Sequence, residues 1–414
     1  MADYIIDEYV LPLTAQEIED RLNKAGNILG DIDKIKSDLD YLYTPDPESP
    51  KVWEEIQVLC RKGKASSVLE IGDVFNVVKD GVSYPFAVMD FITEEGKKGS
   101  LQIKDRNLTT GVIFQSLETL YNLQFDAREA FYATDTGLSA GTYNFVLEEK
   151  PMYNPDTAGK TFQFTLTQDI PAGGQLVWTQ PYNVTFEGAS IDVFSSPNST
   201  EKIESVIMTE GSNGTTLGAS KNTINGNFNA GNRGLYGSGR WETSAIRQQL
   251  NSDAIAGSVW TPQTKWDRPP SWVASTKGFL NGLDEKLKKC IADVEVNTYN
   301  HSVDGNGLCT TTDKVFLAGA NECHFIQRGS DDGIAYEFYR IGSQYSSPSD
   351  NDDPIRIKKS KTGYTEYYAE YWFLRSPYDD FGYPGTVYMT TSSGGISGNS
   401  VFAACGIAPV FVIA

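Results

Sequence analysis

Two apolar segments near the end of the sequence enclose a long polar and aromatic stretch. Trp372–Leu374 and Val410–Ile413 have the composition of buried strands, whereas residues 378–405 are rich in Tyr, Asp, Phe, Gly, Ser and Asn. Tyr, Ser, Gly and Asn suit binding surfaces, because they combine large contact area with adaptable hydrogen bonding. They are also common in ordinary exposed turns. We expect Trp372–Pro377 and Gly406–Ile413 to form a scaffold that holds residues 378–405 facing outward.

The composition favours a globular chain built mainly of strands and turns. Of the 414 residues 40% are hydrophobic and 12% aromatic, and the chain has 38 Gly, 22 Tyr and 20 Phe. A net charge of −19 argues against nucleic-acid binding, because an acidic surface repels phosphates. No segment has the roughly 20 apolar residues of a membrane span, and the first residues lack the basic leader of a signal peptide. We expect neither a nucleic-acid partner nor membrane insertion.

The five cysteines are odd in number and contain no CxxC spacing, which predicts free thiols in a reducing compartment: Cys60, Cys290, Cys309, Cys323 and Cys405. Only His301 and His324 could complete a zinc site, so we predict none. The acidic segment 347–353 offers oxygen ligands for Ca²⁺ at Asp350–Asp353, but it lacks the twelve-residue calcium-loop pattern. A solvated acidic loop is the preferred interpretation, and no metal or cofactor is predicted.

Residues 1–48 predict a helical attachment and oligomerisation segment. Thr14 and Glu17 form a capping box. Apolar residues then recur at mostly alternating three- and four-residue steps, at Ile18, Leu22, Ala25, Leu29, Ile32, Ile35, Leu39 and Leu42. Such a seam needs a partner helix, either from another copy in a stalk or from the same chain.

The middle of the sequence predicts a hairpin, a helix and an inserted set of strands. Residues 67–90 predict paired strands joined by a turn at Lys79–Gly81. Residues 109–130 carry apolar side chains at helical spacing: Ile113, Leu117, Leu120, Leu123 and Phe125. Residues 136–200 predict a β-rich insert with strands at 143–147, 161–166, 175–178 and 183–186. Residues 209–239, rich in Gly and Asn, predict a long loop.

Two short helices and an aromatic loop are expected next. Thr243 or Ser244 caps a helix that buries Ile246 and Leu250. Three Trp and three Pro between residues 260 and 272 predict a rigid loop sealed by aromatic contacts. Residues 282–292 predict the second helix.

Three motifs occur in order: RWETSAIRQQLN at 240–251, TTDKVFLAGANE at 311–322, and WFLRSP…GGIS…GIAPVFVI at 372–413. Together they resemble the phage-associated C-type-lectin-like domain that is also seen in formylglycine-generating enzymes. The resemblance implies an α+β fold over about residues 53–414. It divides the domain into a first part at 49–135, the insert at 136–200 and a main part at 201–414. In that family, motifs at the two ends bracket a ligand-facing loop.

The bracketed loop also resembles the variable region of proteins diversified by retroelements, in which Asn codons change to a restricted set of residues. Ten positions that carry members of this set are the predicted ligand contacts: Tyr378, Asp379, Asp380, Phe381, Tyr383, Tyr388, Thr390, Phe402, Ala404 and Cys405. Five residues are given structural roles: Trp241, Arg247, Trp372, Arg375 and Pro409. We expect the Arg375 guanidinium to hold the base of the loop through a carboxylate or carbonyl groups.

These resemblances imply a receptor-binding protein of a phage tail fibre or tail tip, assembled in the host cytoplasm and carried on the virion. The expected partners are a host surface receptor (protein or glycan), tail or baseplate proteins at the N-terminal segment, and further copies in a homotrimer. One alternative is a bacterial or prophage surface adhesin. The other is an enzyme of the formylglycine-generating type, which would need a copper-binding cysteine pair that Cys309, Cys323 and Cys405 do not form. We predict no enzymatic activity.

Overall fold

The computed structural model describes residues 52–129 except 94, the strands between residues 132 and 220 with a few residues beside them, and residues 237–414 except 265–266, 302–306, 327–332, 361–368 and 379–384. The predicted helical segment at 1–48 lies outside these residues. Most of the predicted loop at 209–239 also lies outside them.

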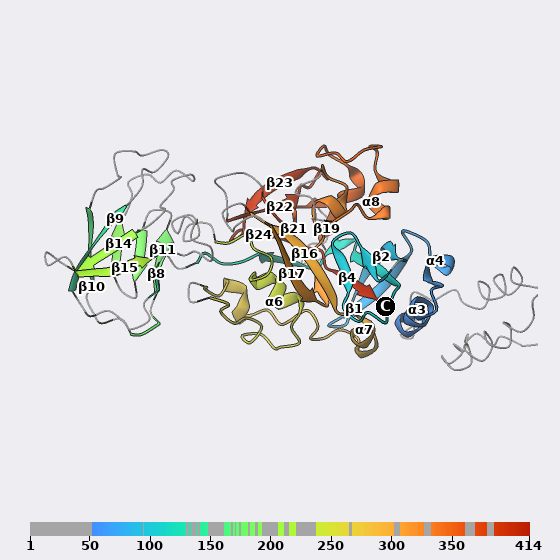
Figure 1. The fold of residues 1–414 in the computed structure, drawn as a ribbon, viewed down its shortest axis with the longest axis horizontal. Helices are drawn as coiled ribbons and strands as arrows, with labels where there is room; N and C mark the ends of the chain where they lie inside the picture. Colours follow the sequence, from blue (N-terminus) through green and yellow to red (C-terminus); the bar gives the residue numbers. More distant parts are fainter. Residues whose placement is uncertain are drawn as a thin grey trace, which may run out of the picture.

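The core of the main body is a five-stranded sheet in the order β1-β2-β5-β25-β18 (Figure 1). Its strands are β1 (Val74–Lys79), β2 (Val82–Ile92), β5 (Gly111–Ser116), β18 (Val315–Phe316) and β25 (Val410–Ile413). β5 and β25 are buried along their whole length, because both are largely apolar and flanked by strands on both sides. Segments about 300 residues apart in sequence are therefore neighbours in this sheet.

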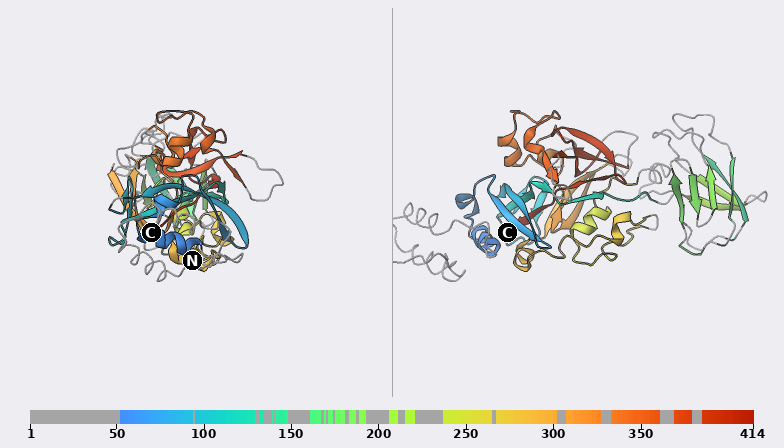
Figure 2. Two further views of the ribbon diagram at one scale, coloured as in Figure 1. Left: turned by 90° about the vertical axis from the view of Figure 1, so that its right-hand side faces the viewer. Right: turned by 180° about the vertical axis from the view of Figure 1, so that it is seen from behind.

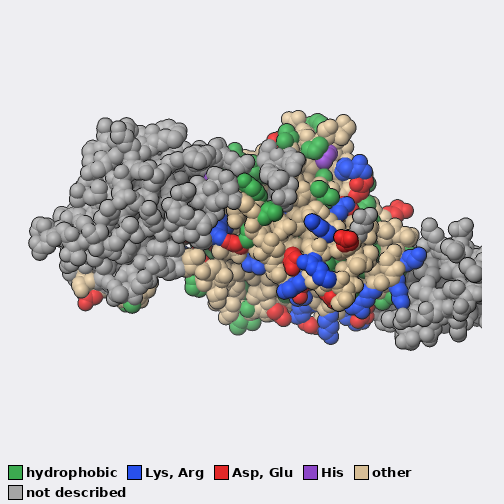
Figure 3. All heavy atoms as spheres, in the orientation of Figure 1, with side chains coloured by type: hydrophobic (Ala, Val, Ile, Leu, Met, Phe, Trp, Pro, Cys, Tyr) green, Lys and Arg blue, Asp and Glu red, His purple; other side chains and the backbone are tan. Residues whose placement is uncertain are grey.

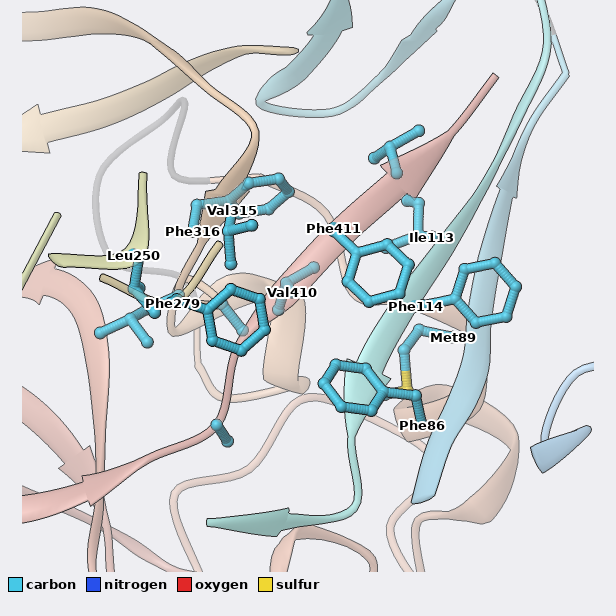
Figure 4. Close-up of a cluster of buried hydrophobic side chains, with 14 of the residues drawn as sticks. Phe86, Met89, Ile113, Phe114, Leu250, Phe279, Val315, Phe316, Val410 and Phe411 are labelled. Carbon is cyan, nitrogen blue, oxygen red and sulfur yellow. The ribbon is translucent and has the colours of Figure 1, made fainter. Parts of the chain in front are cut away.

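Helix α3 (Val52–Arg61) covers this sheet with one apolar face. Its buried side chains recur at helical spacing: Val52, Trp53, Ile56, Leu59 and Cys60. The Trp53 ring meets the Phe114 ring edge-on with 5.5 Å between centroids, and Phe114 stacks on Phe411 at 5.5 Å. Figure 4 shows Phe86 and Met89 beside this pair. Aromatic packing thus joins α3, β2, β5 and β25.

Three further sheets complete the main body. One has the order β17-β16-β4-β3, with strands β3 (Lys97–Lys98), β4 (Leu101–Ile103), β16 (Val294–Asn300) and β17 (Gly307–Asp313). A second has the order β20-β19-β6, with strands β6 (Glu118–Thr119), β19 (Lys358–Ser360) and β20 (Ala369–Glu370). The third has the order β23-β22-β21-β24-β7, with strands β7 (Tyr121–Gln124), β21 (Trp372–Pro377), β22 (Thr386–Thr390), β23 (Ile396–Ser400) and β24 (Ala404–Ile407).

The helices of the described residues are short. They are α4 (Ala65–Val68), α6 (Ala245–Leu250), α7 (Glu285–Cys290) and α8 (Glu337–Gly342), with 3-10 turns η3 (Ser271–Ala274), η5 (Asn321–Cys323) and η6 (Pro354–Arg356). None of the helices in the described part of the chain is long and apolar enough to cross a membrane.

Two further four-stranded sheets lie apart from the main body in the views of Figures 1 and 2. Their strands are β8 (Tyr132–Ala133), β9 (Gly141–Leu147), β10 (Thr161–Leu166), β11 (Gln175–Gln180), β12 (Asn183–Phe186), β13 (Ala189–Asp192), β14 (Val206–Glu210) and β15 (Thr215–Ser220). The four strands predicted within 136–200 are confirmed as β9 to β12. The pairing strands run from Tyr132 to Ser220, beyond the predicted range of 136–200.

Other local predictions are also confirmed. The β1–β2 hairpin turns at Asp80 and Gly81, both with positive φ (55° and 75°), which a tight hairpin turn requires. Ser244 caps α6 by accepting a hydrogen bond from the Arg247 amide, and Ile246 and Leu250 are buried. Helix α7 lies within the predicted range 282–292.

The predicted helix at 109–130 is wrong, because this segment forms β5, β6 and β7. An apolar run buried on both faces does not distinguish strand from helix by spacing, and pairing with β2 and β25 decides the outcome. The predicted α+β, C-type-lectin-like fold is also wrong. The described residues are mostly β, in small sheets arranged like a four-bladed β-propeller, with few helices.

Candidate functional site

The predicted ligand-facing segment belongs to the sheet β23-β22-β21-β24-β7. Strand β21 is buried at every residue and lies between β22 and β24. β22 and β23 form a hairpin in register from Thr386 opposite Ser400 to Thr390 opposite Ile396. β24 pairs with β21 in parallel and with β7 in antiparallel orientation. The segment is therefore largely a sheet, held by a central buried strand.

The described ligand-contact candidates divide by exposure. Tyr378 and Phe402 are half-buried and Ala404 is exposed, so these three contribute to the surface. Tyr388, Thr390 and Cys405 are buried, at 6%, 0% and 3% exposure. Asp379, Asp380, Phe381 and Tyr383 lie outside the described residues.

Tyr378 lies against the β22–β23 hairpin. Its ring centroid is 4.9 Å from that of Tyr388, with the planes at 51°. A Cβ at Gly398 would lie 2.6 Å from Cδ2 of Tyr378, so only glycine leaves room for the ring here. The Tyr378 amide also donates to the Thr386 carbonyl at 3.0 Å. These contacts fix Tyr378 where the segment leaves β21.

Arg375 is fully buried beneath this sheet and makes a two-pronged ion pair with Glu322. Its Nη1 and Nη2 donate to the two Glu322 carboxylate oxygens at 2.6 and 2.7 Å. Nη1 also donates to the Leu317 carbonyl and Nη2 to Ser100 Oγ, both at 2.8 Å. Such a planar fork fixes distance and orientation together. The guanidinium thereby ties β21 to β4 and to the segment around η5.

The Glu322 carboxylate accepts several hydrogen bonds besides those from Arg375. Tyr336 donates its hydroxyl to Oε2 at 2.7 Å, Ser100 donates to Oε1 at 2.6 Å, and the Gly319 amide donates to Oε2 at 2.9 Å. Burial alone would raise the pKa of Glu322, but the Arg375 charge and these hydrogen bonds outweigh it and hold the pKa below its ordinary value. The carboxylate is therefore ionised at neutral pH.

Arg356 is a second buried arginine, and it binds loop carbonyls. Nε donates to the Cys323 carbonyl and Nη2 to the His324 carbonyl, both at 2.9 Å, and Nη1 donates to the Asn351 and Gly394 carbonyls at 3.2 Å. It joins η5, the acidic segment 347–353 and the end of the β22–β23 hairpin.

The carboxylates of the acidic segment 347–353 bond to protein donors. Asp353 caps η6 and accepts from Ser343, Asp350 accepts from the Ile326 amide at 3.2 Å, and Asp352 accepts from Ser393 at 2.7 Å. Asp352 is exposed and Asp350 is half-buried, which agrees with the preferred interpretation as a solvated acidic loop, whereas Asp353 is buried. In the part of the chain that the structure describes, no group of three or more His, Cys, Asp or Glu is arranged to hold a metal ion.

The remaining residues given structural roles are buried or hydrogen-bonded within the body. Trp241 Nε1 and Arg247 Nε donate to the two oxygens of buried Asp313, at 3.0 and 2.6 Å. Trp372 Nε1 donates to the Arg356 carbonyl at 3.0 Å, and the Pro409 carbonyl accepts from the Ser116 amide at 3.0 Å.

Two hollows adjoin β24. The first, of about 320 Å³, is lined by Asn122, Ala369, Glu370, Tyr371, Met389, Asn399, Ala404, Cys405 and Gly406. The second, of about 380 Å³, is lined by Gln124, Ala127, Arg128, Arg268, Pro270, Ser271 and Phe402. Sequence reasoning missed most of these residues, including Asn122, Arg128 and Arg268. They come from three distant segments, and no spacing in the sequence indicates that they meet.

The thiols near this surface are poor nucleophiles. Burial raises the pKa of Cys405 and that of Cys323 to about 12, so both are protonated at neutral pH. The Cys405 sulfur lies 4.0 Å from the Met389 sulfur in the floor of the first hollow. This arrangement suits binding by shape and hydrogen bonding rather than covalent chemistry.

Comparison with known proteins shows a similarity to one family, whose function is unknown. A family described as "Domain of unknown function (DUF6273)" is similar to residues 213–414, slightly less than half of the chain. The matched range contains β21 to β25 and the Arg375–Glu322 pair, but not β1, β2, β5 or β7. No curated protein and no solved structure matches the chain significantly.

Proposed function

We propose that this protein is a receptor-binding adhesin of a phage tail that attaches to a host cell surface through the sheet β23-β22-β21-β24-β7. The observation that carries the proposal is the division of this sheet into a buried, hydrogen-bonded underside and a partly exposed outer surface. Arg375 and Glu322 hold the underside. Ala404 lines the first of the two open hollows and Phe402 the second, and Tyr378 is half-buried against the β22–β23 hairpin. Such a support lets surface side chains change without disturbing the fold.

The motif resemblance to retroelement-diversified proteins supports the same proposal. A diversified position has to be exposed, since a buried substitution leaves a cavity or a clash. Ala404 is exposed and meets this condition, Tyr378 and Phe402 are half-buried and meet it in part, and Tyr388, Thr390 and Cys405 are buried and do not meet it. We therefore propose that diversification, where it occurs, acts on the exposed subset. The neighbouring DNA should carry a near-repeat of these codons that differs at adenines.

Attachment would involve several copies acting together. We propose a homotrimer that binds tail proteins through residues 1–48. Weak contacts at single sites can then add to firm attachment, because each later binding event is intramolecular.

Binding to cells tests the function directly. Fluorescently labelled protein is incubated with a panel of bacterial strains, and the bound amount is compared between wild type and the double variant Tyr378→Ala/Phe402→Ala. We expect wild type to bind a subset of strains and the double variant to bind them at least about tenfold less, since interface aromatics dominate binding energy. The control Ile341→Ala removes a 58%-exposed side chain on α8 and should bind like wild type.

Binding to no strain, or equal loss in the control, would contradict the proposal. Antibodies against the protein should also label the tails of virions released from cells that carry its gene. Labelling of the bacterial surface instead would favour a bacterial adhesin.

A further inference from the structure

The second hollow brings two cationic side chains to the edge of the proposed binding surface. It lies where β7, the turn before β24 and the segment leading into η3 meet. Arg128 and Arg268 line it, together with Phe402 and Pro270 as apolar walls and Gln124 and Ser271 as hydrogen-bonding groups. Its volume of about 380 Å³ lies within the range of small-ligand sites.

Arg268 is the informative residue of this hollow. Its side chain is half-buried, and burial lowers the pKa of its guanidinium. Among the described residues, no carboxylate and no hydrogen-bond acceptor is paired with it. Arg375 and Arg356, in contrast, each donate to several acceptors. A partly desolvated cation without a partner destabilises the folded chain, and an anion that enters the hollow removes this penalty.

The side-chain amide of Gln124 holds the walls of the second hollow in place. Gln124 Nε2 donates to the Phe402 carbonyl at 2.6 Å, and Gln124 Oε1 accepts from the Ser271 amide and hydroxyl at 3.2 and 3.1 Å. Trp272 Nε1 donates to the Gln124 carbonyl at 3.0 Å. These bonds join β7, the turn before β24 and η3 into one rigid rim. A preformed rim reduces the entropy lost on binding.

The rim also has an aromatic wall. The Arg128 guanidinium carbon lies 4.2 Å from the centre of the Phe402 ring, close enough for a cation–π contact. This contact holds the ring beside the hollow. An aromatic ring next to a cation and amide groups suits a sugar ring, whose C–H face packs on the aromatic side chain while its polar groups find donors.

Nearby acidic groups do not line the hollow. Asp126 is half-buried and accepts a hydrogen bond from the Ala127 amide at 2.8 Å, and desolvation raises its pKa well above the ordinary value. Asp267 accepts hydrogen bonds from the amides of Gln263 and Thr264, which partly offset its charge. Glu129 is 6% exposed and lies close enough to Asp126 to contribute to its raised pKa. The guanidinium groups are the charges that face the open space.

We propose that this hollow binds an acidic sugar of the host surface, with the carboxylate on Arg268 and the ring against Phe402. The inference rests on the proposed function and specifies the chemical class of its receptor. An acidic peptide would satisfy Arg268 but would make no use of the aromatic wall. On a chain of net charge −19, this local pair of arginines selects an anion by contact rather than by long-range attraction.

Saturation-transfer NMR on the full-length protein tests the inference. The probes are methyl glucuronide, its neutral counterpart methyl glucoside, N-acetylglutamate amide and inorganic sulfate. We expect transfer to methyl glucuronide and at least tenfold weaker binding of the other three. Arg268→Gln should abolish glucuronide binding, whereas Arg106→Gln, a change at an exposed ion pair with Glu295, should leave it unchanged.

The melting temperature shows whether Arg268 binds a ligand or stabilises the fold. Since Arg268 has no partner, Arg268→Gln should melt at the wild-type temperature or above it. A lower melting temperature would assign Arg268 a structural role and overturn the inference. Equal binding of glucoside, tighter binding of the glutamate derivative or of sulfate, or no transfer to any probe would overturn it as well. The proposed adhesin function would survive these outcomes if the wild-type protein still bound cells and Tyr378→Ala/Phe402→Ala did not.

Discussion

Arg375 and Lys358 are both buried cations, and they differ in what surrounds them. Arg375 meets a carboxylate and two further acceptors. Lys358 is 3% exposed, donates to the Ser116 carbonyl and lies 5.0 Å from the centre of the Trp372 ring. Burial lowers the pKa of Lys358 to about 7. At the scale of single residues, Arg375 therefore stabilises the folded chain, whereas Lys358 destabilises it when its amine is charged.

The Arg375–Glu322 pair gives the first prediction. Glu322→Gln removes one charge and leaves Arg375 buried without its counter-ion, so the free energy of unfolding should fall by about 3–5 kcal/mol. Urea denaturation at pH 7 measures it. Glu337→Gln, at an exposed pair with Arg340, is the matched control and should change little. An equal effect of the two substitutions would show that the buried pair has no special role.

The same pair predicts acid sensitivity. The pKa of Glu322 is lower in the folded chain than in the unfolded chain, so its contribution is fully present above the unfolded pKa of about 4.3 and is lost as pH falls through the folded value. The stability difference between wild type and Glu322→Gln should therefore shrink as the pH falls below about 4.

Lys358→Met gives a prediction of opposite sign. The folded pKa is about 7, against an ordinary value of 10.5, so between these pH values the unfolded chain binds more protons and wild-type stability rises with pH. At pH 6.5 Lys358→Met should be more stable than wild type by on the order of 3 kcal/mol, and the gap should close toward pH 10. Urea denaturation across this range measures it, with exposed Lys359→Met as control. A gap independent of pH would exclude titration of Lys358 as its cause.

At the scale of elements, local signals decided some structures and distant pairing decided others. The α6 cap at Ser244 and the Asp80–Gly81 turn were predictable because their hydrogen bonds and φ angles lie within a few residues. The strand at Gly111–Ser116 was not predictable, because it is stabilised by pairing with β2 and with β25, which is about 300 residues away in the sequence. The proposed binding surface was predictable in part. Tyr378, Phe402 and Ala404 follow from composition, whereas burial of Tyr388, Thr390 and Cys405 depends on the pleat of strands whose register the sequence does not reveal.

The α6 cap gives a prediction at this scale. Ser244 Oγ accepts from the Arg247 amide at 3.3 Å and donates to the Trp241 carbonyl at 3.0 Å. Ser244→Ala should lower the free energy of unfolding by about 1–2 kcal/mol, because one end of the helix loses its cap. Thermal and urea denaturation measure the change. The control Ser258→Ala, at an exposed position, should leave the free energy of unfolding unchanged. If Ser244→Ala also left it unchanged, packing alone would account for the stability of α6.

At the scale of the whole molecule, the fold class could not be read from motifs. Short motifs report local structure, and the arrangement of small sheets depends on pairings across hundreds of residues. The main body needs both parts of the sequence, since β1, β2 and β5 precede the range similar to the DUF6273 family and β18 and β25 lie within it.

The net charge gives a prediction for the intact protein. Figure 3 shows acidic and basic side chains interspersed on one face, so the charge of −19 acts mainly as a long-range field. An anionic cell surface repels such a chain, and salt screens the repulsion over a Debye length of about 8 Å at 0.15 M ionic strength. The protein bound to cells should increase roughly twofold or more between about 10 and 150 mM NaCl. A steady decrease with salt would indicate attraction by a basic surface instead.

The position of β25 has a consequence for synthesis. This strand lies between β5 and β18 and supplies Phe411 to the aromatic core. Until Val410–Ile413 has been synthesised and has left the ribosome, β5 lacks its β25 partner. One edge of β5 is then unpaired, and its apolar side chains are exposed to solvent. We expect chaperones to bind such nascent chains, and proteases to remove truncated products that lack β25 before they accumulate.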